Sequence, residues 1–135
     1  MNYKVEAASI SDNDAIVRII QSEIKFGTGP ATADTLPNPA ELFLGSFASC
    51  ILKNVERFSG MMKFSYAKAN VEVKAVRLEH PPRMDNIYYE LTLFSDDDKL
   101  NVNLLKKNVE KHGTIYNTVK LMSTINGIIN VVPTS

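Results

Sequence analysis

The chain has 135 residues, of which 44% are hydrophobic, and its 15 Lys and Arg balance its 15 Asp and Glu. This length predicts a single domain, residues 1–135, that is large enough to bury a core. The zero net charge argues against binding to nucleic acid or to an anionic membrane surface. No apolar run approaches the roughly 18 residues of a membrane span. Residues 1–10 also lack the apolar core of a signal peptide.

Residues with distinctive reactivity are few. Cys50 is the single cysteine, which excludes an internal disulfide, and His80 and His112 are the two histidines. This set matches no zinc motif, so we expect no metal and no cofactor. The absence of disulfides also fits a reducing compartment, and we expect a cytoplasmic location. Cys50 is therefore the residue whose chemistry needs an explanation.

The first 38 residues predict strands followed by a loop. Residues 2–9 alternate loosely between apolar and polar side chains. Residues 15–26, AIVRIIQSEIKF, are rich in β-branched side chains and predict a strand, although periodicity alone also allows a helix. Two Gly and two Pro in residues 27–38 predict an irregular loop, and such segments often carry function.

A sharp helix boundary follows this loop. Asn38 at the cap, Pro39 at the first helical position and Glu41 at the third predict a capping box. The helix is expected to run to about Phe58 and to stop at Gly60. Its apolar residues cover more than half of its circumference, so we expect it to be buried on more than one face.

Two strands are predicted after the long helix. Residues 66–79 and 86–94 alternate between apolar and polar side chains, and the alternation of the first segment changes phase at Val76. The segment between them contains Pro81 and Pro82. We expect it to join the strands as a loose antiparallel hairpin.

The last part of the chain predicts two helices and a strand. Residues 95–98, Ser-Asp-Asp-Asp, are expected to cap a helix over 99–111 that halts at Gly113, since acidic side chains favour a helix N-terminus. Without a spaced loop of oxygen ligands, the same acidic residues predict a solvated helix start rather than a metal site. A short helix over 114–122 and a closing strand over 127–132 follow. This order predicts an α+β fold with antiparallel sheets.

Cys50 lies near the middle of the predicted long helix. It is about three turns from the helix start and so gains little from the helix dipole, which fades within one turn. A thiolate there would find cations at Lys53 and Arg57, toward the C-terminal end of the helix. Free cysteine is also among the most often buried residue types. The residue alone therefore allows two interpretations, a reactive thiol or a small buried side chain.

Other polar residues of this helix have simpler explanations. Glu41 lies about 13 Å along the helix from Cys50 and on the opposite face, so capping accounts for it. No histidine is placed to activate Ser46 or Ser49, and the sequence has no nucleophile elbow. Hydroxyl groups in helices more often bond back to the chain.

Residues 38–52, NPAELFLGSFASCIL, resemble the Asn-Pro-x-Glu-Leu-(Leu/Phe)…(Ala/Gly)-Ser-Cys motif of the osmotically inducible protein C and organic hydroperoxide resistance (OsmC/Ohr) family. Residues 110–118, EKHGTIYNT, resemble its second site, usually Glu-Lys-x-Cys-Pro-(Val/Ile)-x-x-Thr. The order and spacing of elements agree along nearly the whole chain. The resemblance implies an intertwined homodimer in which central helices pack inside wrapped sheets and two thiol sites lie at the subunit interface.

The resemblance also implies thiol peroxidase chemistry. In the family's peroxidases the helix cysteine attacks the hydroperoxide as a thiolate and becomes a sulfenic acid. A second cysteine condenses with it to a disulfide, which an external dithiol reduces. Cys50 matches the first cysteine, but Gly113 occupies the second position. Ala40 occupies the position of the glutamate that assists the thiol in the hydroperoxide branch.

Candidate supporting residues come from the same comparison. Glu41 matches a glutamate of the other branches of the family. Arg18 and Lys25 are the candidates for the family's loop arginine, because both lie near the Gly/Pro-rich loop.

Two functions follow as hypotheses. In the first, Cys50 is catalytic and reduces an organic hydroperoxide, and a small external thiol resolves its sulfenic acid through a mixed disulfide. In the second, the homodimer is not catalytic and binds a small amphiphile, or a thiol cofactor such as coenzyme A, at the interface pocket. The missing side chains at Gly113 and Ala40 favour the second hypothesis. The candidate pocket-lining residues are Phe43, Ser46, Phe47 and Gly113, with Met61 and Met62 nearby.

Overall fold

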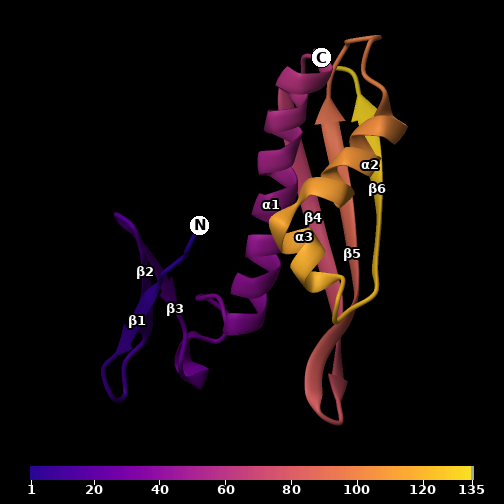
Figure 1. The fold of residues 1–135 in the computed structure, drawn as a ribbon. Helices are drawn as coiled ribbons and strands as arrows, with labels where there is room; N and C mark the ends of the chain where they lie inside the picture. Colours follow the sequence, from indigo (N-terminus) through magenta and orange to yellow (C-terminus); the bar gives the residue numbers. More distant parts are fainter. Residues whose placement is uncertain (135) are drawn as a thin grey trace. The chain divides into compact units, whose positions relative to one another are not determined.

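The computed structural model describes residues 1–134 as two compact units (Figure 1). The first comprises residues 1–43 and the second begins at Leu44, within a helix that starts in the first unit. Along the described chain, no helix is long and apolar enough to cross a membrane. The single-domain interpretation stays a prediction.

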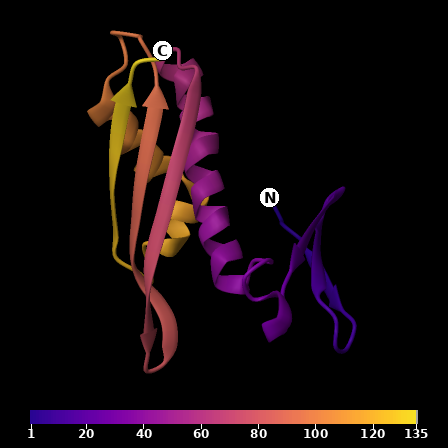
Figure 2. The ribbon, with the colours of Figure 1, turned by 180° about the vertical axis from the view of Figure 1, so that it is seen from behind.

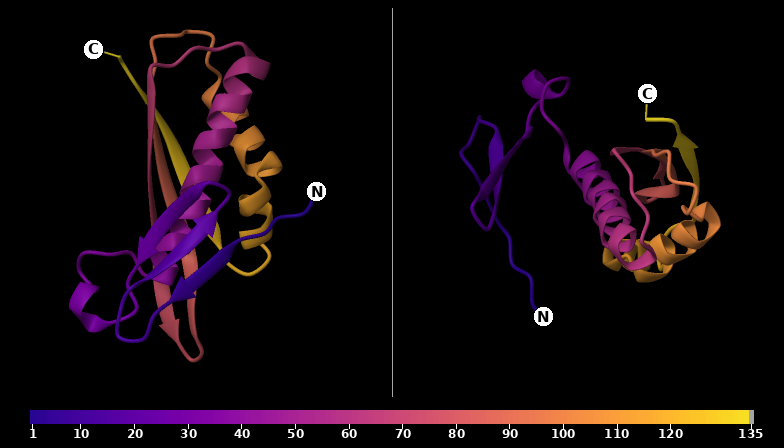
Figure 3. Two further views of the ribbon diagram at one scale, coloured as in Figure 1. Left: turned by 90° about the vertical axis from the view of Figure 1, so that its left-hand side faces the viewer. Right: turned by 90° about the horizontal axis from the view of Figure 1, so that it is seen from above.

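The first unit contains a three-stranded antiparallel sheet, shown in Figure 3. Its strands are β1 (Glu6–Ser9), β2 (Ala15–Ile19) and β3 (Ser22–Phe26), in that order. The single strand predicted over 15–26 is wrong, because the chain turns at Ile20, where φ is 56°. Neither Gly, Asn nor Pro stands at this turn, so no residue with a turn preference marked it in the sequence.

The loop between β3 and the long helix contains one short 3-10 turn, η1 (Pro30–Thr32). The amide of Gly27 donates to the Pro37 carbonyl at 3.0 Å and closes the loop at its base. The Thr32 hydroxyl donates to an Asp14 carboxylate oxygen at 2.7 Å. The irregular loop predicted for this segment is therefore confirmed, and it encloses a hollow of about 320 Å³.

The long helix α1 (Pro39–Met62) begins at the predicted capping box. The Glu41 amide donates to the Asn38 side chain at 2.8 Å, and the Asn38 amide donates to the Glu41 carboxylate at 3.0 Å. The predicted end at Gly60 is wrong. The helix continues to Met62 because Lys63 adopts the left-handed conformation, with φ of 58°. The Phe64 amide then donates to the Ser59 carbonyl at 3.0 Å, a Schellman closure.

The second unit has one mixed sheet of β4 (Lys68–Glu79), β5 (Pro82–Phe94) and β6 (Ile125–Val132), in that order. β4 and β5 are antiparallel, and the predicted phase change at Val76 is a register shift between Lys74 and Val76. β6 runs parallel to β5, so the prediction of purely antiparallel sheets is wrong. The parallel pair arises because two helices carry the chain back along the sheet before β6.

These two helices are α2 (Val102–His112) and α3 (Thr114–Val119), both shorter than predicted. α2 starts later than expected because Asn101, not the acidic run, is its cap, with its side chain accepting from the Leu104 amide at 3.0 Å. Within the second unit, the helices cover one face of the sheet (Figures 1 and 2). The core between these layers confirms the α+β class.

Tyr89, Leu91 and Leu93 of β5 form the centre of this core, and each is completely buried. The helix α1 contributes a single buried stripe, so the predicted burial on more than one face is not met within the chain. The residues of this stripe are Phe47, Ile51, Asn54, Val55 and Phe58.

Candidate active site

Cys50 is placed by α1 beside the junction of α2 and α3. It is a free, half-buried thiol. A Cβ atom at Gly113, the residue between the two helices, would lie 3.1 Å from the Cys50 sulfur. The structure therefore brings together the two positions that the sequence motifs assign to the two thiols of the family.

Asn54 lies one helical turn after Cys50 and is 8% exposed. Its amide nitrogen donates to the Cys50 carbonyl at 2.9 Å and lies 3.6 Å from the Cys50 sulfur. A hydrogen-bond donor at this position stabilises a thiolate more than a thiol. Asn54 was not among the predicted site residues, although its spacing of four residues from Cys50 places the two side chains on one helix face.

Aromatic side chains form one wall of the site. Phe47 is fully buried, and its ring is stacked on Tyr116, with centroids 5.8 Å apart and an interplanar angle of 29°. The centroid of the Tyr89 ring also lies 6.4 Å from that of Phe47. Tyr116 also borders the Gly113 position, because a Cβ there would be 3.1 Å from the Tyr116 Cβ.

The carboxylate of Glu110 interacts with the two tyrosines of this wall. Glu110 accepts a hydrogen bond from the Tyr89 hydroxyl at 2.7 Å and pairs with Lys106 at 2.9 Å. Burial, followed by the charge and hydrogen bond of Glu110, raises the pKa of Tyr116 to about 12. Burial, followed by the hydrogen bond and the charge of Glu110, raises the pKa of Tyr89 far above its usual value. Both phenols therefore stay protonated at neutral pH.

The family model of OsmC-like proteins matches residues 32–126, which include all of these groups. The chain belongs to the OsmC-like family. Its fold is similar to an OsmC-like protein from Mycoplasma pneumoniae, with a TM-score of 0.87 and 17% identity over 98% of each chain. An organic hydroperoxide resistance protein from Elizabethkingia anophelis has a TM-score of 0.72 and 11% identity, over 98% of this chain and 99% of that chain.

OhrB of Bacillus subtilis is a third structure with this fold, with a TM-score of 0.65 and 12% identity over 96% of this chain and 98% of that chain. At such identities the three structures show the shared fold alone. No curated protein sequence matches the chain significantly. The resemblance proposed from the two motifs is nevertheless confirmed at the level of the family.

The other residues selected from the sequence of this OsmC-like chain are distributed over both units. Phe47 and Gly113 are buried at the site, and Ser46 is exposed on α1. Phe43 is half-buried in the first unit, where Glu41 caps α1. Their part in a pocket or in catalysis stays a prediction.

The candidate loop-arginine positions both lie on strands of the first unit. Arg18 is on β2 and makes an exposed ion pair of 3.5 Å with Glu23. Lys25 is on β3, where it is paired in register with Ile16. The part of Arg18 and Lys25 in the site stays a prediction.

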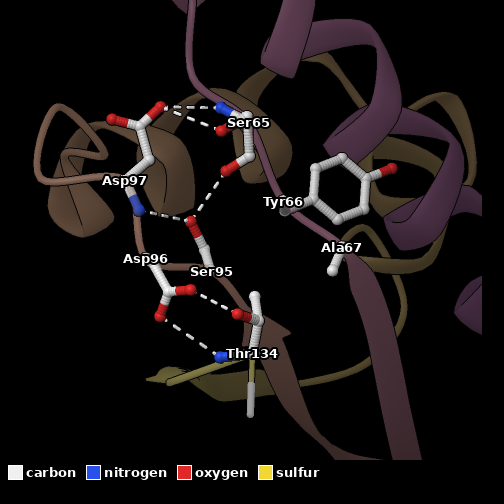
Figure 4. Close-up of a pocket in the computed structure, with 7 residues that line it drawn as sticks. All are labelled: Ser65, Tyr66, Ala67, Ser95, Asp96, Asp97 and Thr134. Atoms are coloured by element: carbon white, nitrogen blue, oxygen red, sulfur yellow. Dashed lines mark hydrogen bonds between the residues drawn. The ribbon is translucent and has the colours of Figure 1, made fainter.

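The acidic run has a structural role instead of capping α2. Figure 4 shows that Asp96 and Asp97 accept hydrogen bonds from segments far apart in the sequence. Asp97 accepts from the Ser65 amide at 2.8 Å, and Asp96 accepts from the Thr134 amide at 3.2 Å and from its hydroxyl. The bonds from Thr134 lower the pKa of Asp96, and those from the Lys99 amide and then the Ser65 amide lower the pKa of Asp97. Asp96 and Asp97 line a hollow of about 410 Å³ at the end of the sheet. None of the residues that line this hollow belongs to the Cys50 site.

Metal ligation has no support in the described part of the chain. Among residues 1–134, no group of three or more His, Cys, Asp or Glu side chains is arranged to hold a metal ion. The chemistry available at the site is that of the Cys50 sulfur.

Proposed function

We propose that this OsmC-like protein reduces organic hydroperoxides with Cys50 as its one catalytic residue and a small external thiol as reductant. The observation that carries the proposal is the position of the sulfur of the half-buried Cys50, 3.1 Å from the Cβ position of Gly113 and 3.6 Å from the Asn54 amide nitrogen. Organic hydroperoxide resistance proteins among the structures of similar fold support the choice of substrate class.

The reaction proceeds in three balanced steps. The Cys50 thiolate attacks the terminal oxygen of the hydroperoxide, the O–O bond breaks, and the alcohol leaves with one proton while the sulfur becomes a sulfenic acid. A first external thiol attacks this sulfur, the S–O bond breaks and water is released, and the product is a mixed disulfide. A second thiol attacks the mixed disulfide and releases Cys50 and an external disulfide. Two thiols are oxidised for each hydroperoxide reduced.

The need for an external thiol follows from Gly113. Glycine has no sulfur to condense with the sulfenic acid, and Cys50 is the single cysteine of the chain. Without a reductant the sulfenic acid would be oxidised further to the sulfinic acid, which is irreversible for most proteins. A homodimer in the cytoplasm, where small thiols are kept reduced, forms part of the proposal.

Gly113 also favours a second candidate function. A protein that binds a small amphiphile or coenzyme A without catalysis needs neither a second thiol at 113 nor a carboxylate at Ala40. In that case Cys50 lines the pocket and does not react.

Intact mass spectrometry separates the two functions. We expect one equivalent of cumene hydroperoxide to add one oxygen atom to the protein within minutes, and 2-mercaptoethanol to convert this product into a thiol adduct that dithiothreitol removes. The five methionines also gain oxygen on oxidation, so Cys50→Ser is the required comparison. The variant Ser49→Ala, which changes an exposed hydroxyl on the same helix, serves as the matched control.

The outcomes are distinct. An oxygen gain in wild type and Ser49→Ala that is absent in Cys50→Ser supports the peroxidase. An equal gain in all three proteins, or none in any, excludes it. In the latter case, a copurified small molecule detected by native mass spectrometry would support the binding function.

A further inference from the structure

Arg57 and His112 both lie against the ring of Phe58. The guanidinium carbon of Arg57 is 5.5 Å from the centroid of the Phe58 ring. The His112 ring lies against the same ring, with centroids 5.5 Å apart and an interplanar angle of 41°. Because His112 directly precedes Gly113, these contacts connect Arg57 on α1 to the residue that borders the Cys50 sulfur.

Arg57 follows Cys50 by seven residues, which is two helical turns. The two residues therefore share one face of α1, with about 10.5 Å between them along the helix axis. Long side chains on a helix point back toward its N-terminus, and that direction leads from Arg57 toward Cys50. The contact with Phe58 favours an extended Arg57 side chain, and the N–H groups at the edge of its guanidinium are left to donate to a ligand.

Two cations of this rim are held in no ion pair among the described residues. Arg57 and Lys53 are exposed, and within residues 1–134 neither makes an ion pair with a carboxylate. The acidic neighbour on α1, Glu56, accepts the hydroxyl hydrogen of Tyr66. Glu110, on α2, is already engaged by a tyrosine and a lysine. An anion that approaches Cys50 from this side therefore meets two cations first.

We propose that Arg57 recognises an acid group on the external thiol, so that the preferred reductant is an anionic small thiol whose acid group is several bonds from its sulfur. This deepens the function proposed above and rests on it for its biological meaning. While the acid group is bound at Arg57, the thiol sulfur can reach Cys50 along the shared helix face. The sulfur forms the S–S bond of the mixed disulfide, and the oxygen of the sulfenic acid leaves as water.

Two matched probes test the proposal without requiring the peroxidase reaction. They are the symmetrical disulfides of 6-mercaptohexanoate and of 6-mercaptohexanol, which differ in charge at the end of the same six-carbon chain. The Cys50 thiolate attacks either disulfide, forms the mixed disulfide and releases one equivalent of the probe thiol. The rate is measured by intact mass on the full chain at neutral pH and low ionic strength.

We expect the anionic probe to react about threefold to tenfold faster than the neutral probe with the wild-type protein. The ratio should fall toward one in Arg57→Gln, where Lys53 is left without the arginine, and should also fall in 0.5 M salt, where exposed charges are screened. Arg77→Gln, which removes an exposed arginine of β4, should keep the wild-type ratio. Arg57→Lys should keep part of it, because the charge remains without the planar donor group.

Equal rates for the two probes, or a preference that Arg57→Gln retains, would overturn the proposal. Its outcome is separate from that of the peroxidase test. A charge preference in this exchange together with no oxygen gain from hydroperoxide would disprove the peroxidase and retain Arg57 as the anion site. Oxygen gain without a charge preference would retain the peroxidase and disprove the role of Arg57.

Discussion

The sulfur of Cys50 and the Cβ position of Gly113 are 3.1 Å apart. In a disulfide, the Cβ atom of one cysteine lies about 3 Å from the sulfur of the other, as the S–S bond length requires. The two positions thus have the geometry of a disulfide, although only Cys50 carries a side chain. A second thiol could be restored here with little rearrangement of the backbone.

The first prediction is that Gly113→Cys forms an intramolecular disulfide with Cys50. The backbone at 113, with φ of −75° and ψ of 119°, is open to any residue. The new Cβ would contact the Val109 carbonyl at 3.1 Å, so small shifts are needed. We expect one equivalent of hydroperoxide to lower the intact mass by two hydrogens, and dithiothreitol to reverse it.

The matched control for this variant is Gly45→Cys. Gly45 lies on α1, and a Cβ there has no neighbour within 4 Å. We expect this second cysteine to remain reduced within the chain. If both double-cysteine proteins lost two hydrogens equally, or if Gly113→Cys did not, the disulfide geometry inferred for 113 would be wrong.

The second prediction concerns Asn54. In Asn54→Leu, which keeps the number and branching of the side-chain heavy atoms, the donor near the Cys50 sulfur is lost. We expect iodoacetamide to alkylate Cys50 about threefold to tenfold more slowly at neutral pH, since the thiolate loses one hydrogen bond. Ser49→Ala should alkylate at the wild-type rate. An unchanged rate in a folded Asn54→Leu protein would show that this contact does not support the thiolate.

The site was predictable from the sequence only where local spacing determines it. The Asn38–Glu41 capping box is an interaction within one turn, so its residue types predicted it directly. The contact of Cys50 with Gly113 joins residues far apart in the chain, and only the resemblance to the second motif suggested it. The partnership of Glu110 with Tyr89 had no signal at all, because α2 and β5 meet through tertiary packing.

Helix ends were less predictable for a related reason. Gly60 favours a helix end, but α1 ends at the left-handed Lys63. Asp98 favours a helix start, but Asn101 caps α2. Propensity ranks residues locally, and tertiary contacts such as the buried Phe64 decide between neighbouring candidates. The parallel β5–β6 pair was missed because strand direction depends on the path of the connection, not on alternation.

The third prediction tests the cap that the sequence did not identify. Asn101→Ala removes the acceptor for the Leu104 amide and should lower the free energy of unfolding by about 1 kcal/mol. Asp98→Ala, at the expected cap, is an exposed change and should cost less than about 0.5 kcal/mol. Urea denaturation of both variants decides between the two caps. The reverse order of the two effects would restore the acidic run as the cap.

The fourth prediction concerns Gly127 of β6. A Cβ atom there would lie 2.1 Å from the Tyr89 ring, which is completely buried and cannot move away. We expect Gly127→Ala to lower the free energy of unfolding by about 2 kcal/mol or more. Gly60→Ala is the control, because its Cβ meets nothing within 4 Å inside α1, and it should raise stability by about 0.5–1 kcal/mol. Equal effects of the two substitutions would contradict the packing of Tyr89 on Gly127.

The last prediction concerns stability at alkaline pH. The raised pKa of Tyr116, about 12, exceeds the value of about 10 for tyrosine in an unfolded chain. Between these two values the unfolded chain releases a proton that the folded chain keeps. The free energy of unfolding therefore has its full contribution below about pH 10 and falls as the pH rises toward 12.

We expect the urea midpoint of the wild-type protein to fall between about pH 9.5 and pH 11.5, and to fall less in Tyr116→Phe, which has no phenol to titrate at this position. Below about pH 9 the urea midpoints of the two proteins should change with pH in the same way, because tyrosine is protonated in both the folded and the unfolded chain. The buried Tyr89 adds to the fall in both proteins, since its pKa is also raised. A fall of the same size in Tyr116→Phe would show that burial beside Glu110 does not affect the ionisation of Tyr116.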